Sequence, residues 1–109
     1  MLARKTLELM TCNHLPGDGE MADYALPMGY GEVGFAGNGF GLTVAVTKGP
    51  QATGVVGSHG EFMWGGAAST AFWVDPVEQL AVVFMTQLLP SGTFNFRGQL
   101  KALVYGALL

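Results

Sequence analysis

The chain has 109 residues, enough for one small domain. Hydrophobic residues make up 50% of it and charged residues only 12%, about half the share usual in a soluble domain. We therefore expect part of its apolar surface to be covered by protein that is absent from the chain. The net charge of −3 gives no basic footprint and excludes a typical nucleic-acid-binding protein.

Cysteine and histidine usage leaves little room for a metal centre. Cys12 is the single cysteine, so an internal disulfide or a cysteine-based zinc site is impossible. His14 and His59 lack the His-x-x-x-His spacing, and we expect no metal and no cofactor. Because no stretch reaches about 20 apolar residues and no signal peptide follows Met1, the chain as it stands is expected to be cytoplasmic, without a membrane span.

The first third of the chain predicts one helix and one long loop. Residues 2–14 suit a short helix with Leu2, Leu9 and Met10 on one face, stopped by Pro16-Gly17. Residues 16–34 contain five glycines and two prolines and show no hydrophobic period. Loops of that length inside a compact domain are usually functional or partly ordered.

Three strands are predicted in the centre of the chain. Residues 40–47 are β-branched and apolar and end at the turn signal Lys48-Gly49-Pro50. Residues 67–74 form the second candidate, and Asp75-Pro76-Val77-Glu78 favours a type I turn and a tight hairpin. The third candidate, residues 80–86, is apolar throughout, which indicates a strand buried on both faces.

The C-terminal segment shows the clearest helical period. After a loop over residues 88–95, one helix face collects Phe96, Leu100, Leu103, Val104, Ala107 and Leu108. The chain therefore predicts a single partial α+β domain, residues 1–109, with an antiparallel sheet of about three strands flanked by an N-terminal and a C-terminal helix. A strand buried on both faces needs a layer on each side, so the uncovered face must pack on a missing segment or on another copy.

The serines carry no recognisable nucleophile motif. Ser58, Ser69 and Ser91 all lack the lysine three residues on that the Ser-x-x-Lys pair requires. The sequence from Val56 to Gly60 lacks the first glycine of the esterase elbow. Ser58 and His59 are adjacent, and on an extended segment such neighbours point to opposite faces, which argues against a catalytic dyad.

The segment from Gly57 to Pro76 is the most distinctive part of the sequence. It reads Gly-Ser-His-Gly-Glu-Phe-Met-Trp-Gly-Gly-Ala-Ala-Ser-Thr-Ala-Phe-Trp-Val-Asp-Pro. This order resembles the C-terminal block of class C β-lactamase-like serine hydrolases, which include penicillin-binding-protein-like enzymes and family VIII esterases. In that family a Lys-Thr-Gly or His-x-Gly triplet lies on the strand that edges the active site, followed by a Trp-Gly-Gly stretch, a strand ending in Asp-Pro and an apolar strand. Residues 80–87 are similar to that apolar strand, and residues 7–17 to the helix and loop before the sheet.

The resemblance implies a set of site residues. Ser58-His59-Gly60 takes the place of the triplet, although Ser58 replaces the usual Lys or His, and His59 is implied to contact a substrate carboxylate or carbonyl. Gly60 would let the substrate lie against the strand, and the backbone amide of Glu61 would serve the oxyanion. Trp64-Gly65-Gly66 matches the tryptophan motif. The alternatives are a core anchor for Trp64, a bulge at Gly65-Gly66, and an exposed His59 without catalytic duty.

The implied reaction is acyl transfer to water from a small-molecule ester or β-lactam. The family's Ser-x-x-Lys and Tyr-x-Asn motifs are absent, since Tyr24, Tyr30 and Tyr105 are not followed by x-Asn. We therefore expect the C-terminal fragment of a serine hydrolase, inactive alone and completed by a missing N-terminal half. A self-associating binding or assembly module without catalysis, a homo-oligomer, and a complementing subunit whose partner carries Ser-x-x-Lys remain alternatives.

Overall fold

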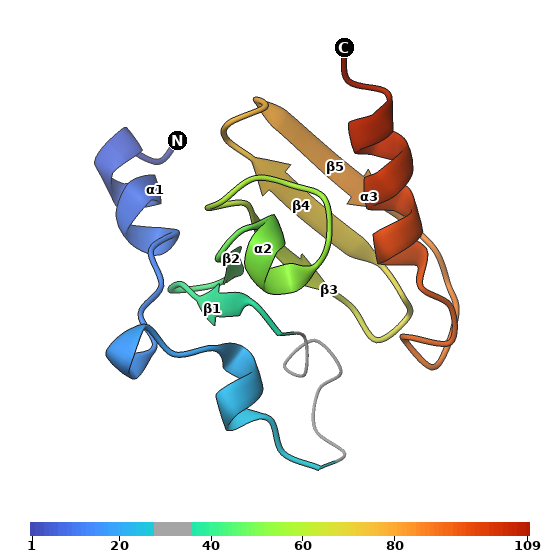
Figure 1. The fold of residues 1–109 in the computed structure, drawn as a ribbon, viewed down its shortest axis with the longest axis horizontal. Helices are drawn as coiled ribbons and strands as arrows, with labels where there is room; N and C mark the ends of the chain where they lie inside the picture. The colour runs from blue at the N-terminus through green and yellow to red at the C-terminus, as the bar shows by residue number, and fades with distance from the viewer. Residues whose placement is uncertain (28–35) are drawn as a thin grey trace.

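The computed structural model describes residues 1–27 and 36–109, and it places a five-stranded antiparallel sheet at the centre of the molecule (Figure 1). The strands pair in chain order and are β1 (Asn38–Phe40), β2 (Ala45–Thr47), β3 (Phe62–Gly65), β4 (Ala71–Asp75) and β5 (Leu80–Phe84). The predicted α+β class is confirmed. The predicted number of strands, about three, was too low.

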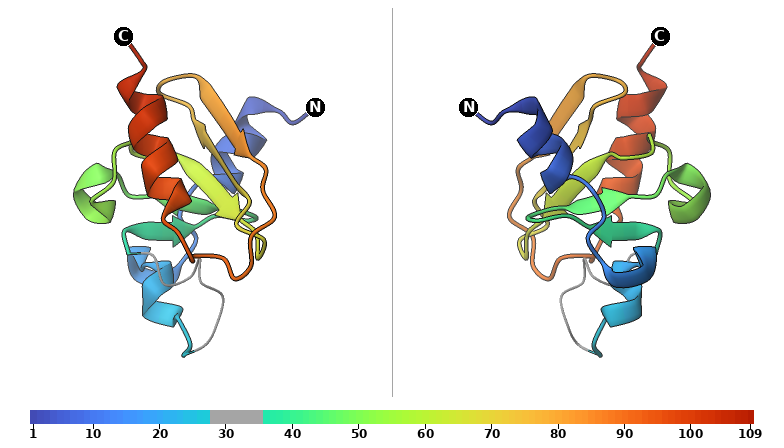
Figure 2. Two further views of the ribbon diagram at one scale, coloured as in Figure 1. Left: turned by 90° about the vertical axis from the view of Figure 1, so that its right-hand side faces the viewer. Right: turned by 90° about the vertical axis from the view of Figure 1, so that its left-hand side faces the viewer.

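Three α-helices and two 3-10 turns surround this sheet in the described part of the chain. They are α1 (Arg4–Met10), η1 (Pro16–Asp18), η2 (Met21–Tyr24), α2 (Pro50–Thr53) and α3 (Phe96–Gly106). Figure 2 shows α2 and α3 on one side of the sheet and α1 on the other. None of these helices is long and apolar enough to cross a membrane.

The N-terminal predictions need two corrections. The first helix spans seven residues instead of residues 2–14, and none of its residues is buried, with Leu2 and Leu9 more than half exposed. The predicted loop 16–34 contains η1 and η2, whose Met21 is part of the core. The remainder of that loop, residues 28–35, lies outside the described residues.

The predicted strand 40–47 is two strands joined by a turn. The amide of Gly41 donates to the carbonyl of Val44 at 2.8 Å and closes the chain back on itself. A Cβ at Gly41 would overlap the carbonyl oxygen of Met10, and the amide of Leu42 donates to the same oxygen at 3.0 Å. The end of α1 therefore requires a glycine here, a contact between distant segments that local β propensity does not reveal.

The strand β3 was not predicted, and β4 begins later than expected. Residues 67–70, assigned to the second strand, belong to the turn that joins β3 to β4. Gly66 and Thr70 close this turn through an N–H···O bond of 3.0 Å, and Ser69 adopts a φ of +67°. The pairing of Trp64 with Phe72 then sets the hairpin register.

The tight hairpin predicted after β4 is confirmed. Asp75 pairs with Leu80 across the turn, and its Oδ1 accepts the amides of Val77 at 2.9 Å and Glu78 at 3.1 Å. The aspartate therefore fixes the turn through its own side chain, as short acidic residues do at such positions.

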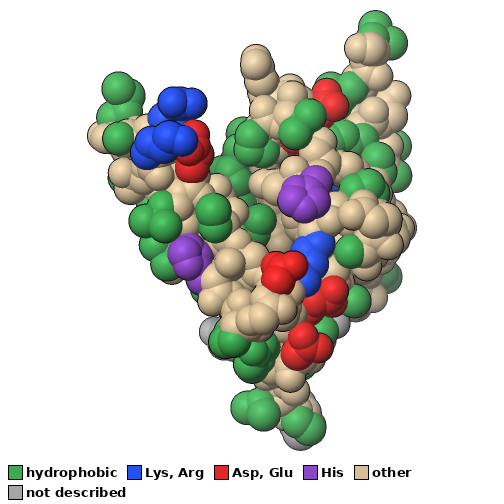
Figure 3. All heavy atoms as spheres, turned by 60° about the vertical axis from the view of Figure 1, so that its left-hand side comes forward, with side chains coloured by type: hydrophobic (Ala, Val, Ile, Leu, Met, Phe, Trp, Pro, Cys, Tyr) green, Lys and Arg blue, Asp and Glu red, His purple; other side chains and the backbone are tan. Residues whose placement is uncertain are grey.

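The prediction that the strand at residues 80–86 is buried on both faces is wrong for this chain. The side chains of β5 alternate between half-buried and exposed, and Val83 is 70% exposed. Within the described residues β5 is also the last strand of the sheet. The apolar pattern anticipated a layer on each side, but one face of β5 is half-buried and the other is exposed. Figure 3 shows apolar side chains spread over the surface among few charged ones.

The predicted C-terminal helix begins at Phe96 as expected, with Asn95 as its N-cap, but its buried face is only partly right. Phe96, Leu100 and Val104 are half-buried, whereas the other three predicted face residues, Leu103, Ala107 and Leu108, are exposed. Arg97, Lys101 and Tyr105, spaced four residues apart, are directed to the sheet instead. The helix is rotated so that its polar residues face partners in the rest of the fold. A hydrophobic period does not predict such a rotation.

Candidate functional site

The residues singled out by the sequence lie at opposite ends of β3. Ser58, His59 and Gly60 form a turn before the strand, and Trp64-Gly65-Gly66 ends it. At about 3.3 Å per residue, the strand separates the Cα atoms of Glu61 and Gly65 by roughly 13 Å. The structure therefore does not gather the predicted residues into one site.

The predicted oxyanion donor is already engaged in the turn. The amide of Glu61 donates to the carbonyl of Ser58 at 3.3 Å, and Glu61 is 0% exposed. Its position leaves no amide to offer a substrate, so the assignment of that role to Glu61 does not fit the geometry. Gly60 adopts a φ of +82° and donates to the carbonyl of Thr47 at 3.0 Å. The positive φ in this turn is sufficient to explain why residue 60 is a glycine, and no contact with a substrate is needed.

Ser58 and His59 diverge, as the sequence suggested. Ser58 is half-buried and its side chain lies near enough to Asp75 to lower the pKa of that carboxyl group, while the side chain of His59 is exposed. The triplet therefore lies in a turn and not on a strand that edges a cleft. Its serine supports a buried carboxylate instead of facing a substrate.

A buried ionic cluster joins this turn to α3, and the sequence analysis missed it. Glu61 and Asp75 are both 0% exposed. Lys101 Nζ donates to Glu61 Oε1, and Tyr105 Oη lies 2.7 Å from both Glu61 Oε2 and Asp75 Oδ2. The available signal was the four-residue spacing of Lys101 and Tyr105, which places both on one helix face.

The environment of the cluster shifts two of its pKa values. Burial acts to raise the pKa of Asp75, but hydrogen bonds from Ser58, Tyr105 and the amides of Glu78 and Val77 outweigh it and hold that pKa below 3.8. Burial, together with the two neighbouring carboxyl groups, raises the pKa of Tyr105 above its ordinary value. Tyr105 therefore keeps its hydroxyl proton and Asp75 remains ionised near neutral pH.

The other end of β3 borders open space. Trp64 is half-buried and its ring meets Phe40 edge to face, with centroids 5.6 Å apart. Gly65 pairs with Ala71, and a Cβ at Gly66 would overlap the hydroxyl of Thr70. The two glycines allow the chain to turn tightly from β3 into β4. Trp64 directly precedes this turn and therefore lies near the end of the strand.

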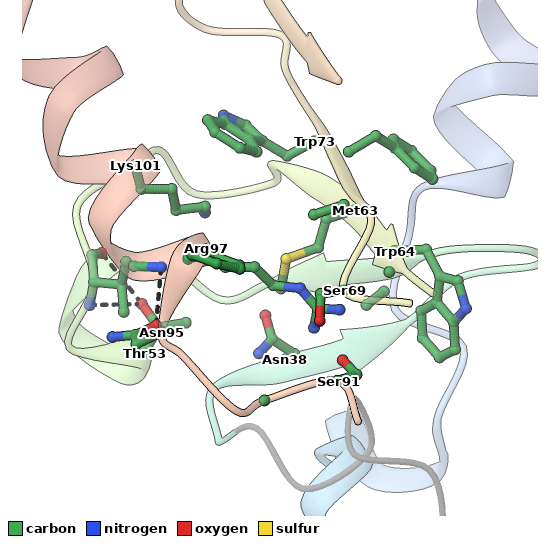
Figure 4. A pocket seen from close by; sticks show the side chains of 18 of the residues that line it. Asn38, Thr53, Met63, Trp64, Ser69, Trp73, Ser91, Asn95, Arg97 and Lys101 are labelled. Carbon is green, nitrogen blue, oxygen red and sulfur yellow. Dashed lines mark hydrogen bonds between the residues drawn. The ribbon is translucent and has the colours of Figure 1, made fainter. Parts of the chain in front are cut away.

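A cavity of about 500 Å³ lies between the sheet and α3 (Figure 4). Trp64 and Gly65 reach its wall, and its main side chains are Asn38, Met63, Ser69, Trp73, Arg97 and Lys101. In Figure 4 the side chain of Arg97 extends from α3 into the cavity, where its Nη2 lies 3.5 Å from the carbonyl oxygen of Thr70. The volume is within the range of small-molecule sites, which run from about 300 to 1,000 Å³.

A second hollow of about 210 Å³ adjoins the same end of β3. Trp64, Gly65 and Gly66 line it together with Val83 and Met85 of the exposed apolar surface. Because both hollows meet at Trp64 and Gly65, this end of β3 is the candidate binding site of the chain.

The described residues hold no nucleophile paired with a base. Ser69 is buried and its hydroxyl donates to the carbonyl of Leu88 at 2.7 Å, and Ser58 lies beside the carboxyl group of Asp75, whose pKa it lowers. Ser91 lines the cavity. No hydrogen bond joins any of these serines to a described lysine or histidine, and no group of three or more potential metal ligands occurs in residues 1–27 and 36–109.

Neither a scan against protein-family models nor a search of curated proteins found a match for the chain.

Proposed function

We propose that this chain forms the sheet of a β-lactamase-like serine hydrolase and acts together with a segment outside these 109 residues that carries the attacking serine. The order of elements supports the proposal. A strand that ends in Trp64-Gly65-Gly66 leads through a hairpin to β4, an Asp-Pro turn, the apolar β5 and the helix α3. That order agrees with the resemblance found in the sequence.

The observation that carries the proposal is the meeting of two hollows at Trp64 and Gly65. An aromatic rim beside glycines gives an apolar acyl group a flat surface on which to lie. Arg97 projects into the larger cavity from α3 and adds a cation to a largely apolar wall. These features suit a small ester or a β-lactam, whose polar carbonyl is attached to an apolar body.

The chain would contribute binding and not the covalent step. A hydrolase of this class needs a hydroxyl activated by a neighbouring base. Of the described serines, Ser69 is bonded to a carbonyl, Ser58 lies beside a carboxylate and Ser91 lies on the cavity wall. A binding wall of this kind becomes catalytic only when a nucleophile is presented to it.

A labelling experiment tests where the nucleophile lies. The purified chain is incubated with a fluorescent penicillin and with a fluorophosphonate probe, and we expect no covalent adduct and no hydrolysis of a chromogenic ester. Mixing with the Ser-x-x-Lys-bearing half of a β-lactamase-like hydrolase is expected to produce activity. The Trp64→Ala variant should lose at least tenfold of it, whereas Val77→Ala, at an exposed turn position, should not. An adduct on a serine of the chain alone contradicts the proposal.

A self-associating module is the second candidate, and one observation favours it. Val83 and Met85 are 70% and 77% exposed on or just beyond a strand whose outer edge pairs with no other described strand. Uncharged edges of this kind readily pair with another chain. Association and hydrolysis are compatible, because a sheet that lacks one covering layer can be completed by either partner.

A further inference from the structure

The two edges of the sheet differ in how their backbone groups are occupied. At β1 the amide of Phe40 donates to Asn13 Oδ1 at 3.0 Å, and the carbonyl of Phe40 accepts the amide of His14 at 2.8 Å. The N-terminal segment therefore blocks this edge. At the other edge, β5 pairs with β4 alone among the described strands. Of the two edges, β5 is thus the one that is open to another strand.

The hydrogen bonds of the sheet show which residues of β5 point outward. In an antiparallel ladder, successive residues direct their N–H and C=O groups to opposite sides of the strand. In the register of β3 and β4, the amide of Gly66 donates to the carbonyl of Thr70 at 3.0 Å, and Phe72, two residues further on, therefore also bonds to β3. Trp73 must then bond to β5, where its partner is Val82.

The residues on either side of Val82, Ala81 and Val83, consequently direct their N–H and C=O groups away from the sheet. In the described part of the chain no strand lies beyond β5 to bond with them. Their side chains are exposed as well, and that of Val83 is 70% exposed. The left view of Figure 2 shows α3 beside β5 and not across its edge. Ala81 and Val83 therefore offer backbone donors and acceptors together with apolar side chains.

The charge pattern around β5 allows it to pair with a copy of itself. From Leu80 to Asn95 the sequence contains no charged residue, so a second β5 placed antiparallel brings no like charges together. Glu78, the nearest charged residue before the strand, would lie opposite Thr86 of the second copy. Charged side chains and proline, which natural edge strands use to prevent pairing, are absent from residues 80–86.

We propose that two copies of the chain pair antiparallel through β5, about a two-fold axis at Val82, so that their sheets become continuous. This centre overlaps all five residues of each strand, and Ala81 of one copy then exchanges N–H···O bonds with Val83 of the second copy. Because the β1 edge is blocked, β5 can pair only with another β5, and the assembly closes as a dimer instead of growing into a filament. The inference rests on the self-association proposed above as the second candidate function.

Two substitutions of Ala81 test the backbone bonds. Ala81→Pro removes an outward N–H that the chain itself does not use, and proline is tolerated at such edge positions. We expect sedimentation equilibrium to give twice the monomer mass for the parent and at least a tenfold higher dissociation constant for Ala81→Pro. Ala81→Val is the matched control, since it keeps the N–H, and it should associate as tightly as the parent. Circular dichroism checks that both variants are folded.

Disulfide cross-linking tests the register. In a Cys12→Ser background, Val82→Cys places two thiols across the two-fold axis. Facing residues that do not bond to each other have Cα atoms about 4.5 Å apart, which is within the range of disulfides. We expect Val82→Cys to oxidise to a covalent dimer at least tenfold faster than Val77→Cys, whose exposed side chain lies in the hairpin turn away from the axis.

The possible outcomes separate this interface from self-association in general. A parent that stays monomeric overturns both and leaves the β5 edge to a different polypeptide. If the parent associates but Ala81→Pro binds as tightly as Ala81→Val, or Val82→Cys cross-links no faster than Val77→Cys, pairing through β5 is overturned and self-association stands. Assembly beyond the dimer overturns the closed arrangement.

Discussion

Individual residues in the segment 57–66 have structural duties that their sequence pattern does not reveal. Gly60 is required by a positive φ, and Glu61 is a buried partner of Lys101 instead of an exposed backbone donor. Ser58 supports Asp75. The Trp64–Gly66 end of the segment lines a hollow of the molecule. The segment 57–66 therefore lies next to the candidate binding site at one end, while the residues at its other end stabilise the fold.

The backbone conformation of Gly60 leads to a stability prediction. Gly60→Ala should destabilise the protein by about 1–2 kcal/mol, because a Cβ is unfavourable at a φ of +82° even though the space around it is open. Urea unfolding measures the change. Gly106→Ala, in open space on α3, is the matched control and should be neutral or stabilising by up to about 1 kcal/mol. Equal effects at both positions would contradict the turn assignment.

The support that Ser58 gives to Asp75 predicts a pH effect. The pKa of Asp75 is held below its ordinary 3.8, so this carboxylate contributes stability above that pH and loses its contribution as the pH falls through its lowered value. Ser58→Ala should raise the titration midpoint of Asp75, followed by carboxyl carbon NMR, and shift acid unfolding to higher pH. Ser91→Ala, on the cavity wall, should change neither. If the titration midpoint of Asp75 does not change in Ser58→Ala, Ser58 does not stabilise the Asp75 carboxylate.

Among the elements, α3 shows best how a correct helix can present an unexpected face. Its hydrophobic period locates the helix but also includes Leu103, which is 72% exposed. The polar residues at four-residue spacing decide the rotation, because Lys101 and Tyr105 find buried carboxyl partners just before β3 and at the end of β4. The aromatic contact between Phe84 and Phe96, with centroids 5.6 Å apart, fixes the other end of the helix.

Two leucines of α3 test this rotation. Leu100→Ala should cost about 1–2 kcal/mol of unfolding free energy, since Leu100 is half-buried. Leu103→Ala should stay within about 0.5 kcal/mol, because its side chain is largely in solvent. Urea titrations of the two variants at one pH provide the comparison. A larger loss for Leu103→Ala would contradict this rotation of the helix.

For the whole molecule, α2 and α3 lie over one face of the sheet and α1 lies on the other side, and none of these three helices contains a fully buried residue. Among residues 1–27 and 36–109, the buried apolar residues are Met21, Ala45, Val46, Ala71 and Trp73. A core of this size leaves apolar surface that another polypeptide can bury.

The exposed strand β5 predicts association at the scale of the molecule. Light scattering should give a mass above that of the monomer, and Val83→Lys should lower it because a charge on the edge strand opposes pairing. The unfolding free energy should change by no more than about 0.5 kcal/mol. Gln99→Lys, an exposed position on α3, adds the same charge and should leave the mass unchanged. A wild-type chain that stays monomeric contradicts this prediction.

The sequence by itself determined the α+β class, the Asp75 hairpin and the start of α3 at Phe96, because each follows from local chemistry: turn residues, β-branched runs and a helical period. Only the tertiary structure decided that Gly41 divides a strand, that β5 is half exposed and that Glu61 and Asp75 share Tyr105. Those features depend on contacts between segments far apart in the chain. The same distinction applies to the candidate site. Trp64 was identified from its sequence motif, whereas the cavity beside it arises from the packing of α3 on the sheet and is known only from the tertiary structure.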